Sequence, residues 1–266
     1  MKRNALILIG LIILVLAFVL YRSRIKTASV REAASQNEKL VAHTKPMTTE
    51  RVELKTQDDA VIVGDFYDTG NLADTGIVSL HMMPATRESF SILAIKLQKA
   101  GYPGVAIDLR GHGESEGGPD GYKAFKDEDH QQSIEDVRAV AEFLKTKGVK
   151  TIYLIGASIG ANLALEYLAE SSEAKAAVLL SPGLDYRGIK TKPLIKKVSS
   201  GKAVYLVAAD DDAYSAESIR KLFDEVPAGV ARTMTVYKSG GHGTTLFQTQ
   251  PELIGEIEKW VQSLKK

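Results

Sequence analysis

The sequence predicts an α/β protein, with a mostly parallel sheet of eight strands that is covered by helices on both faces. Apolar runs of strand length alternate along residues 50–266 with stretches of helical periodicity, as expected when helices connect parallel strands. The run 203–209 is apolar at every position and does not alternate with polar residues. A strand of that kind is buried on both faces, so helices must cover both sides of the sheet. A region of this length can bury a complete core.

The chain opens with an apolar segment that we interpret as a membrane anchor. Residues 5–21 carry no charge and would extend about 26 Å as a helix. Cationic residues flank the segment on both sides, and no small-residue cleavage site follows it. We predict an uncleaved single-pass anchor over 1–22, and the similar cationic flanks leave the side of the membrane open. Residues 23–49 are polar and charged and are predicted to form a tether.

The predicted elements of the following region come in a regular order. Two strands at 50–54 and 61–67 are joined by a polar turn and are expected to form an opening hairpin. Strands are then expected at 76–80, 105–109, 151–155, 176–180, 203–209 and 233–237, and helices at 89–99, 132–147, 161–169, from 215 onward and at 251–264. The last helix is amphipathic, with Trp260 on its apolar side. The carboxyl ends of the parallel strands should share one edge of the sheet, where ligands bind in such folds.

One boundary between a strand and a helix carries a Gly-x-Ser-x-Gly pattern, from Gly156 to Gly160. A tight turn at this point holds the serine in a strained backbone conformation. The flanking residues must be small, because Cβ atoms there would clash with the strand or the helix. The serine hydroxyl then projects above the sheet beside a helix N-terminus, whose N–H groups favour negative charge. Ser158 is therefore the candidate nucleophile.

Two strands downstream end in an acid and in a histidine. The run 203–209 leads directly into Asp210, Asp211 and Asp212, and the last strand ends in a glycine-rich loop that contains His242. A serine, an acid and a histidine in this chain order form the triad of one class of serine hydrolases, in which the histidine is the base and the acid orients it.

Further motifs complete a resemblance to the α/β-hydrolase superfamily. The segment 108–115 matches the Asp-x-Arg-Gly-His-Gly-x-Ser loop that follows the fourth strand in that family, and 80–84 stands where the family has His-Gly-x after its third strand. The resemblance covers most of 50–265 and implies the α/β-hydrolase fold, with no metal or organic cofactor. In the family the acid sits three residues after the small residue that ends its strand. That register favours Asp212, with Asp211 as the alternative.

The resemblance also implies an oxyanion hole made of two backbone N–H groups. One belongs to Ile159, the residue after the nucleophile, and the other by register to Met83, with Met82 as the alternative. Met82 replaces the glycine that is usual in the family, which leaves the geometry of this loop open. His81 is expected to brace the loop, and His112 is expected to be structural.

The segment 182–201, between the predicted sixth and seventh strands, is too short to build a cap domain. We expect it to form a loop with at most one short helix, and we expect an open active site. Lid-gated lipases and capped aminopeptidases are therefore disfavoured. An epoxide hydrolase or a dehalogenase would also need an aspartate where Ser158 stands. A carboxylesterase or a thioesterase fits the sequence better.

Composition and charge argue against several other kinds of partner and covalent modification. A net charge of +1, with both signs interspersed, argues against nucleic acid as a partner. The chain has no cysteine, which excludes disulfides and a lipoprotein anchor. His43 and His130 lie among polar residues and are predicted to be exposed to solvent. We expect a membrane-anchored serine hydrolase that acts on small acyl esters or thioesters. The alternative is a catalytically idle scaffold that binds a ligand or partner at the membrane, which only Met82 favours.

Overall fold

A computed structural model of the chain describes residues 46–264. The predicted anchor at 1–22 and most of the predicted tether at 23–49 lie outside the described residues. Among the helices that are described, none is long and apolar enough to cross a membrane.

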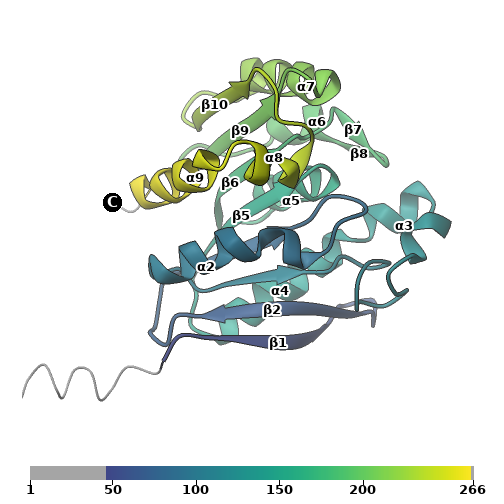
Figure 1. The fold of residues 1–266 in the computed structure, drawn as a ribbon, viewed down its shortest axis with the longest axis vertical. Helices are drawn as coiled ribbons and strands as arrows, with labels where there is room; N and C mark the ends of the chain where they lie inside the picture. Colours follow the sequence, from purple (N-terminus) through teal and green to yellow (C-terminus); the bar gives the residue numbers. More distant parts are fainter. Residues whose placement is uncertain (1–45, 265–266) are drawn as a thin grey trace, which may run out of the picture. The chain divides into compact units, whose positions relative to one another are not determined.

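Within the described part of the chain, eight strands form one sheet in the order β1-β2-β4-β3-β5-β6-β9-β10 (Figure 1). Their bounds are β1 (Thr48–Lys55), β2 (Val61–Asp68), β3 (Thr75–Leu80), β4 (Gly104–Ile107), β5 (Thr151–Ala157), β6 (Ala174–Leu180), β9 (Ala203–Ala209) and β10 (Ala231–Tyr237). β2 pairs antiparallel with β1 and with β4, and every other pairing is parallel. The predicted eight-stranded, mostly parallel sheet is thus confirmed, including its opening hairpin.

Helices pack on both faces of this sheet (Figure 1). One face carries α4 (Ile134–Thr146), α5 (Ile159–Glu170), α6 (Thr191–Ile195) and α7 (Ala213–Glu225), and the other carries α2 (Ser91–Lys99), α8 (Leu246–Thr249) and α9 (Glu252–Ser263). The short α3 (Asp127–Gln131) and the 3-10 turns η1 (Arg87–Phe90), η2 (Gly121–Ala124) and η3 (Gly243–Thr245) lie in the connections.

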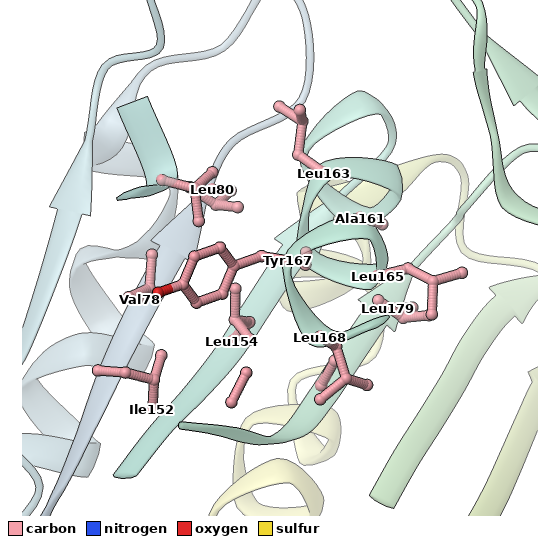
Figure 2. Close-up of a cluster of buried hydrophobic side chains, with 14 of the residues drawn as sticks. Val78, Leu80, Ile152, Leu154, Ala161, Leu163, Leu165, Tyr167, Leu168 and Leu179 are labelled. Carbon is pink, nitrogen blue, oxygen red and sulfur yellow. The ribbon is translucent and has the colours of Figure 1, made fainter. Parts of the chain in front are cut away.

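The continuous apolar strands supply two cores, because successive side chains of a strand point to opposite faces. In β5, Ile152 and Leu154 belong to the cluster under α4 and α5, whereas Ile155 belongs to the cluster under α2 and α9. Figure 2 shows the first cluster, where the Tyr167 ring extends from α5 toward Val78 of β3. The strand and the helix that flank the predicted nucleophile are therefore held by dense packing on both sides.

Two connections differ from what the sequence predicts. The helix expected at 132–147 is preceded by the separate α3, and the segment 182–201 contains a small antiparallel hairpin, β7 (Asp185–Tyr186) and β8 (Ile189–Lys190), in addition to α6. The prediction that His130 is exposed was wrong, since it is only 2% exposed. The His130 ring, in α3, packs edge-on against Phe125, which lies just before the helix, at 5.3 Å between ring centroids. His43 lies outside the described residues.

Candidate active site

The candidate nucleophile Ser158 sits on the tight turn between β5 and α5. Its backbone angles are φ 55° and ψ −121°, in a region that a non-glycine residue adopts only at a cost of about 1–3 kcal/mol. A Cβ atom at Gly156 would collide with the backbone of Gly160, and one at Gly160 would collide with the carbonyl of Leu80. The Ser158 N–H donates to the Leu180 carbonyl at 2.8 Å, which ties the turn to β6. The packing of the flanking elements thus imposes the strained turn.

A histidine and an acid meet beside this turn. His242 Nδ1 lies 2.6 Å from Asp212 Oδ2, and the Asp212 side chain is only 15% exposed. A carboxylate on Nδ1 fixes the tautomer in which Nδ1 carries the proton and Nε2 is an acceptor. The loop that carries His242 is fixed as well, because the Gly243 N–H donates to Ser181 Oγ at 2.9 Å. The histidine can therefore act as a base through Nε2.

The three consecutive aspartates have three different contacts. Asp212 bonds to His242, whereas Asp211 accepts hydrogen bonds from the N–H groups of Gly240 and Gly241 at 2.9–3.3 Å. These N–H groups, that of Gly240 first, hold the pKa of Asp211 below its ordinary value. Asp210 pairs with Arg220 at 2.6 Å. The structure therefore places Asp212 on the histidine and Asp211 on the backbone of the loop that presents it.

The loop after β3 is organised by the buried His81. His81 Nδ1 donates to the Met82 carbonyl and Nε2 accepts from the Leu109 N–H, both at 2.9 Å. Burial, followed by the neighbouring His112, lowers the pKa of His81 to about 3, so the ring is neutral and can accept at Nε2. Because the Met82–Met83 peptide is trans, its N–H points away from the carbonyl that His81 holds.

Within residues 46–264, the backbone N–H groups of Met83, in the loop after β3, and of Ile159, next to Ser158 in the chain, have no hydrogen-bond acceptor. Ile159 is the first residue of α5, where the helix dipole favours negative charge. The Met82 side chain lies against Gly243, since a Cβ atom there would meet its sulfur. The residue that replaces the family glycine is thus accommodated by a glycine next to His242.

The loop 108–115 acts as a scaffold for the β3 loop. His112 stacks on Tyr122 at 4.3 Å between ring centroids and lies edge-on to His81 at 4.8 Å. The buried Asp108 carboxylate accepts from the Arg87 backbone N–H and pairs with its guanidinium. His112 thus contacts neighbouring rings in the scaffold, in line with the structural role that the sequence predicts.

Tyr186, in the β7–β8 hairpin, lies at the candidate site and was not predicted from the sequence. Its ring is edge-on to the His242 ring at 6.2 Å between centroids, and its hydroxyl is 3.2 Å from Ser215 Oγ. Ser158 is only 8% exposed, so the site is less open at the serine than expected. The pair Arg187-Gly188 is the sequence signal that could have located the hairpin that carries Tyr186. Both residues have positive φ, and two consecutive residues of that kind form the tight turn of a two-residue hairpin.

No group of three or more His, Asp or Glu side chains within residues 46–264 is arranged to hold a metal ion. The absence of a cofactor stays a prediction.

A family model described as the alpha/beta hydrolase fold matches residues 77–238. The chain belongs to the α/β-hydrolase fold family. The match spans the strands that carry the Gly-x-Ser-x-Gly turn and the three aspartates, and it ends just after β10.

Individual relatives of this α/β hydrolase agree with the assignment. It is 31% identical over 107 residues to the AB hydrolase superfamily protein YisY of Bacillus subtilis, a match that covers 40% of this chain and 37% of the length of YisY. The Pyrococcus furiosus esterase Pf2001 superimposes with a TM-score of 0.69 at 22% identity, over 83% of this chain and 92% of the esterase. The esterase EaEST of Exiguobacterium antarcticum gives 0.63 at 15% identity, over 82% of this chain and 100% of that chain. At these identities the two structures show the shared fold.

Proposed function

We propose that this α/β hydrolase is a serine hydrolase that cleaves small carboxylic esters or thioesters through Ser158, His242 and Asp212. The observation that carries the proposal is the strained turn that presents Ser158 at the carboxyl edge of the sheet, beside the His242–Asp212 pair. A protein that only binds a ligand needs neither the strain nor the pair. The two structural relatives described above are both esterases by name.

The first half of the reaction forms an acyl-enzyme. His242 Nε2 takes the Ser158 proton as Oγ attacks the carbonyl carbon, and Asp212 stabilises the imidazolium that forms. The carbonyl oxygen becomes an oxyanion, which accepts hydrogen bonds from the N–H groups of Ile159 and Met83. Each such donor contributes roughly 3–4 kcal/mol to transition-state stabilisation in comparable enzymes. The bond to the leaving group then breaks, and His242 returns the proton to the departing oxygen or sulfur.

The second half releases the acid. Water attacks the acyl carbon and gives its proton to His242, and the same N–H groups bind the second oxyanion. The bond to Ser158 Oγ breaks, and His242 returns the proton to the serine. His81 contributes through the β3 loop, because it holds the Met82 carbonyl so that the Met83 N–H faces away from it.

The alternative is an idle scaffold that binds a ligand or partner at the membrane, and Met82 was the feature that favoured it. The Met82 side chain packs against Gly243 and is half-buried. It therefore occupies the space that the glycine leaves free, which supports the hydrolase over the scaffold.

The catalytic test is hydrolysis of p-nitrophenyl acetate, p-nitrophenyl butyrate and a butyryl thioester by the full-length chain and by Ser158→Ala. We expect turnover that falls at least a thousandfold in the variant, since removal of a triad serine leaves only the contribution of the oxyanion hole and binding. Ser172→Ala, on an exposed residue just after α5, is a matched control that also removes one serine hydroxyl. Equal activity of Ser158→Ala and wild type would contradict the proposal.

We propose further that residues 5–21 anchor the enzyme as a single membrane-spanning helix. The support is the uncharged apolar segment and its cationic flanks. On fractionation, the full-length chain is expected in the membrane pellet after a carbonate wash, and a chain that lacks 1–22 in the supernatant. Release of the full-length chain by carbonate would contradict a spanning anchor.

A further inference from the structure

The β7–β8 hairpin brings a phenol to the serine–histidine pair. The Tyr186 ring lies edge-on to the His242 ring. Burial is the main cause that raises the pKa of Tyr186, the Asp212 carboxylate raises it further, and a hydrogen bond with the Ser158 hydroxyl lowers it. These contacts come from three separate connections, those after β5, β9 and β10. The Tyr186 hydroxyl is therefore placed where the proton of the proposed reaction moves.

Sheet order decides which side of the serine the phenol occupies. β5 carries Ser158 and lies between β3 and β6. The candidate oxyanion donor Met83 follows β3, whereas the hairpin with Tyr186 follows β6, on the side of β9 and β10. Tyr186 and the oxyanion loop thus flank Ser158 from opposite sides, so the phenol does not join the oxyanion hole.

The hairpin is held firmly in this position. The Tyr186 ring packs edge-on against the Tyr214 ring at 5.6 Å, and the Tyr214 hydroxyl bonds to the backbone of Asp185 at 3.0–3.1 Å. Asn162, one turn into the helix that begins after Ser158, donates to the Ile189 carbonyl at 2.8 Å. The helix after the serine thus fixes the position of the hairpin.

The phenol is a neutral donor. Burial raises the pKa of Tyr186 above its ordinary value of 10, so the hydroxyl keeps its proton at neutral pH. Ser215 Oγ is 3.2 Å from this hydroxyl and is also 3.3 Å from the Ser181 carbonyl. Ser215 can donate to that carbonyl and accept from Tyr186, and rotation of the phenol O–H redirects its proton toward a substrate.

We propose that Tyr186 is a catalytic residue that donates a hydrogen bond to the leaving-group oxygen of an oxygen ester. This inference rests on the proposed serine hydrolase function. The leaving group must lie near His242, because Nε2 protonates it, and the Tyr186 ring contacts the His242 ring from the side opposite the oxyanion loop. As the carbon–oxygen bond breaks, its electron pair stays on the departing oxygen. The proton that this oxygen gains comes from His242, whereas the Tyr186 proton stays on the phenol.

The inference narrows the substrate class to oxygen esters of alcohols. An alkoxide leaving group accumulates much negative charge on its oxygen, and a donor is most useful there. A nitrophenolate spreads its charge into the ring, and sulfur is a weak acceptor, so neither gains much from the phenol. Tyr186 therefore favours alkyl esters over matched thioesters.

The test varies the leaving group at constant acyl group. Wild type and Tyr186→Phe, as full-length chains, are compared on ethyl butyrate, p-nitrophenyl butyrate and a butyryl thioester. The constant kcat/KM is measured, because it covers only the steps up to the acyl-enzyme. We expect Tyr186→Phe to lose about tenfold on the ethyl ester, the effect of one hydrogen bond to a charged oxygen, and less than about twofold on the other two.

Tyr214→Phe is the matched control. It also removes one phenol hydroxyl, and it loosens the hairpin without removing the Tyr186 donor. Its loss should be the same on all three substrates. An equal loss on all three substrates for Tyr186→Phe would overturn the inference, since Tyr186 would then only support the hairpin. A wild-type chain that hydrolyses none of them and reacts with no fluorophosphonate would overturn the serine hydrolase proposal itself, and this inference with it.

Discussion

The two sides of Ser158 are built in different ways. On the side of β3, the candidate oxyanion donor is placed by backbone contacts with His81, a buried and neutral ring that packs edge-on against His112. On the side of β6, β9 and β10, the groups that would move protons are placed by Asp212, by serine hydroxyls and by an aromatic hairpin. The first side thus supplies fixed dipoles and the second supplies titratable groups. Substitutions on the two sides should therefore reduce activity and stability in different ways.

The largest effect is expected on the proton-transfer side. Asp212→Asn keeps the size of the side chain but favours the wrong tautomer of His242, so we expect kcat to fall by about 10⁴-fold with little change in stability. Asp211→Asn is the matched control. It weakens the loop contacts of Gly240 and Gly241, and we expect a loss below about tenfold. Steady-state kinetics of both variants gives the ratio, and a larger loss for Asp211→Asn would reverse the assignment of the two aspartates.

On the oxyanion side, His81→Phe should reduce both activity and stability. The substitution keeps a buried ring but leaves the Leu109 N–H without its acceptor, which costs about 1–3 kcal/mol. It also frees the Met82 carbonyl, so the Met83 N–H loses its orientation, and we expect kcat to fall by about 10²-fold. The loss should be independent of pH, because the His81 ring is neutral. His112→Phe, which leaves the hydrogen bond between His81 and the Met82 carbonyl in place, should keep most of the activity.

The two sides touch where Met82 lies against Gly243, and a double-mutant cycle measures their coupling. Gly243→Ala places a methyl group against the Met82 sulfur and also strains a residue with φ 58°. We expect a loss of about 1–3 kcal/mol in the free energy of unfolding. Met82→Ala should recover part of that loss, the part due to the collision. Denaturant unfolding of the two single variants and the double variant checks this, and strict additivity would mean that the side chains are not in contact.

The helix that follows Ser158 carries a residue, Glu166, whose ionisation can be tested without altering either side of the site. Glu166 of α5 has one carboxylate oxygen buried without a partner, and burial, followed by Glu170, raises its pKa from 4.5 to about 7. The Glu166 carboxyl therefore binds its proton more tightly in the folded protein than in the unfolded chain. As a result, the free energy of unfolding falls as pH rises from 4.5 to 7, and the contribution of the protonated carboxyl is fully present only below that range. Glu166→Gln does not titrate. Solvent screens part of the effect, because the Glu166 side chain is partly exposed. We therefore expect the free energy of unfolding of the variant to exceed that of wild type by about 1–2 kcal/mol at pH 8, and by a fraction of that at pH 5.

Urea unfolding at the two pH values checks this prediction. An equal difference at pH 5 and pH 8 would mean that Glu166 ionises normally in the folded protein.

The sequence predicts the features that short stretches of chain determine. The eight strands follow from apolar runs, and Ser158 follows from a turn whose glycines are required by contacts within a few residues and with Leu80. An acid and a histidine were predicted because Asp210–Asp212 and His242 lie in the loops after two strands, and strand ends meet at one edge. The register of the family pattern then favoured Asp212. The structure brings the Asp212 and His242 side chains together.

Tyr186 and His130 could not be predicted in this way. The position of Tyr186 depends on Tyr214 and Ser215 of α7, which are far from it in sequence. His130 is buried against Phe125, which lies five residues before it, although its immediate neighbours in sequence are polar. The contacts that place Tyr186 are tertiary, and Arg187-Gly188 indicates only the turn beside it. For His130, the polar neighbours outweigh the single apolar residue nearby.

The most direct test of the account is covalent labelling of the full-length chain with a fluorophosphonate, followed by mass spectrometry of its peptides. The account predicts one adduct, on Ser158, that is absent from Ser158→Ala and much slower to form in Asp212→Asn. Ser181 and Ser215 lie nearby and serve as internal controls that should stay unlabelled. A folded wild-type chain that gains no adduct, or gains it on another serine, would contradict the claim that Ser158 is the nucleophile of an assembled active site.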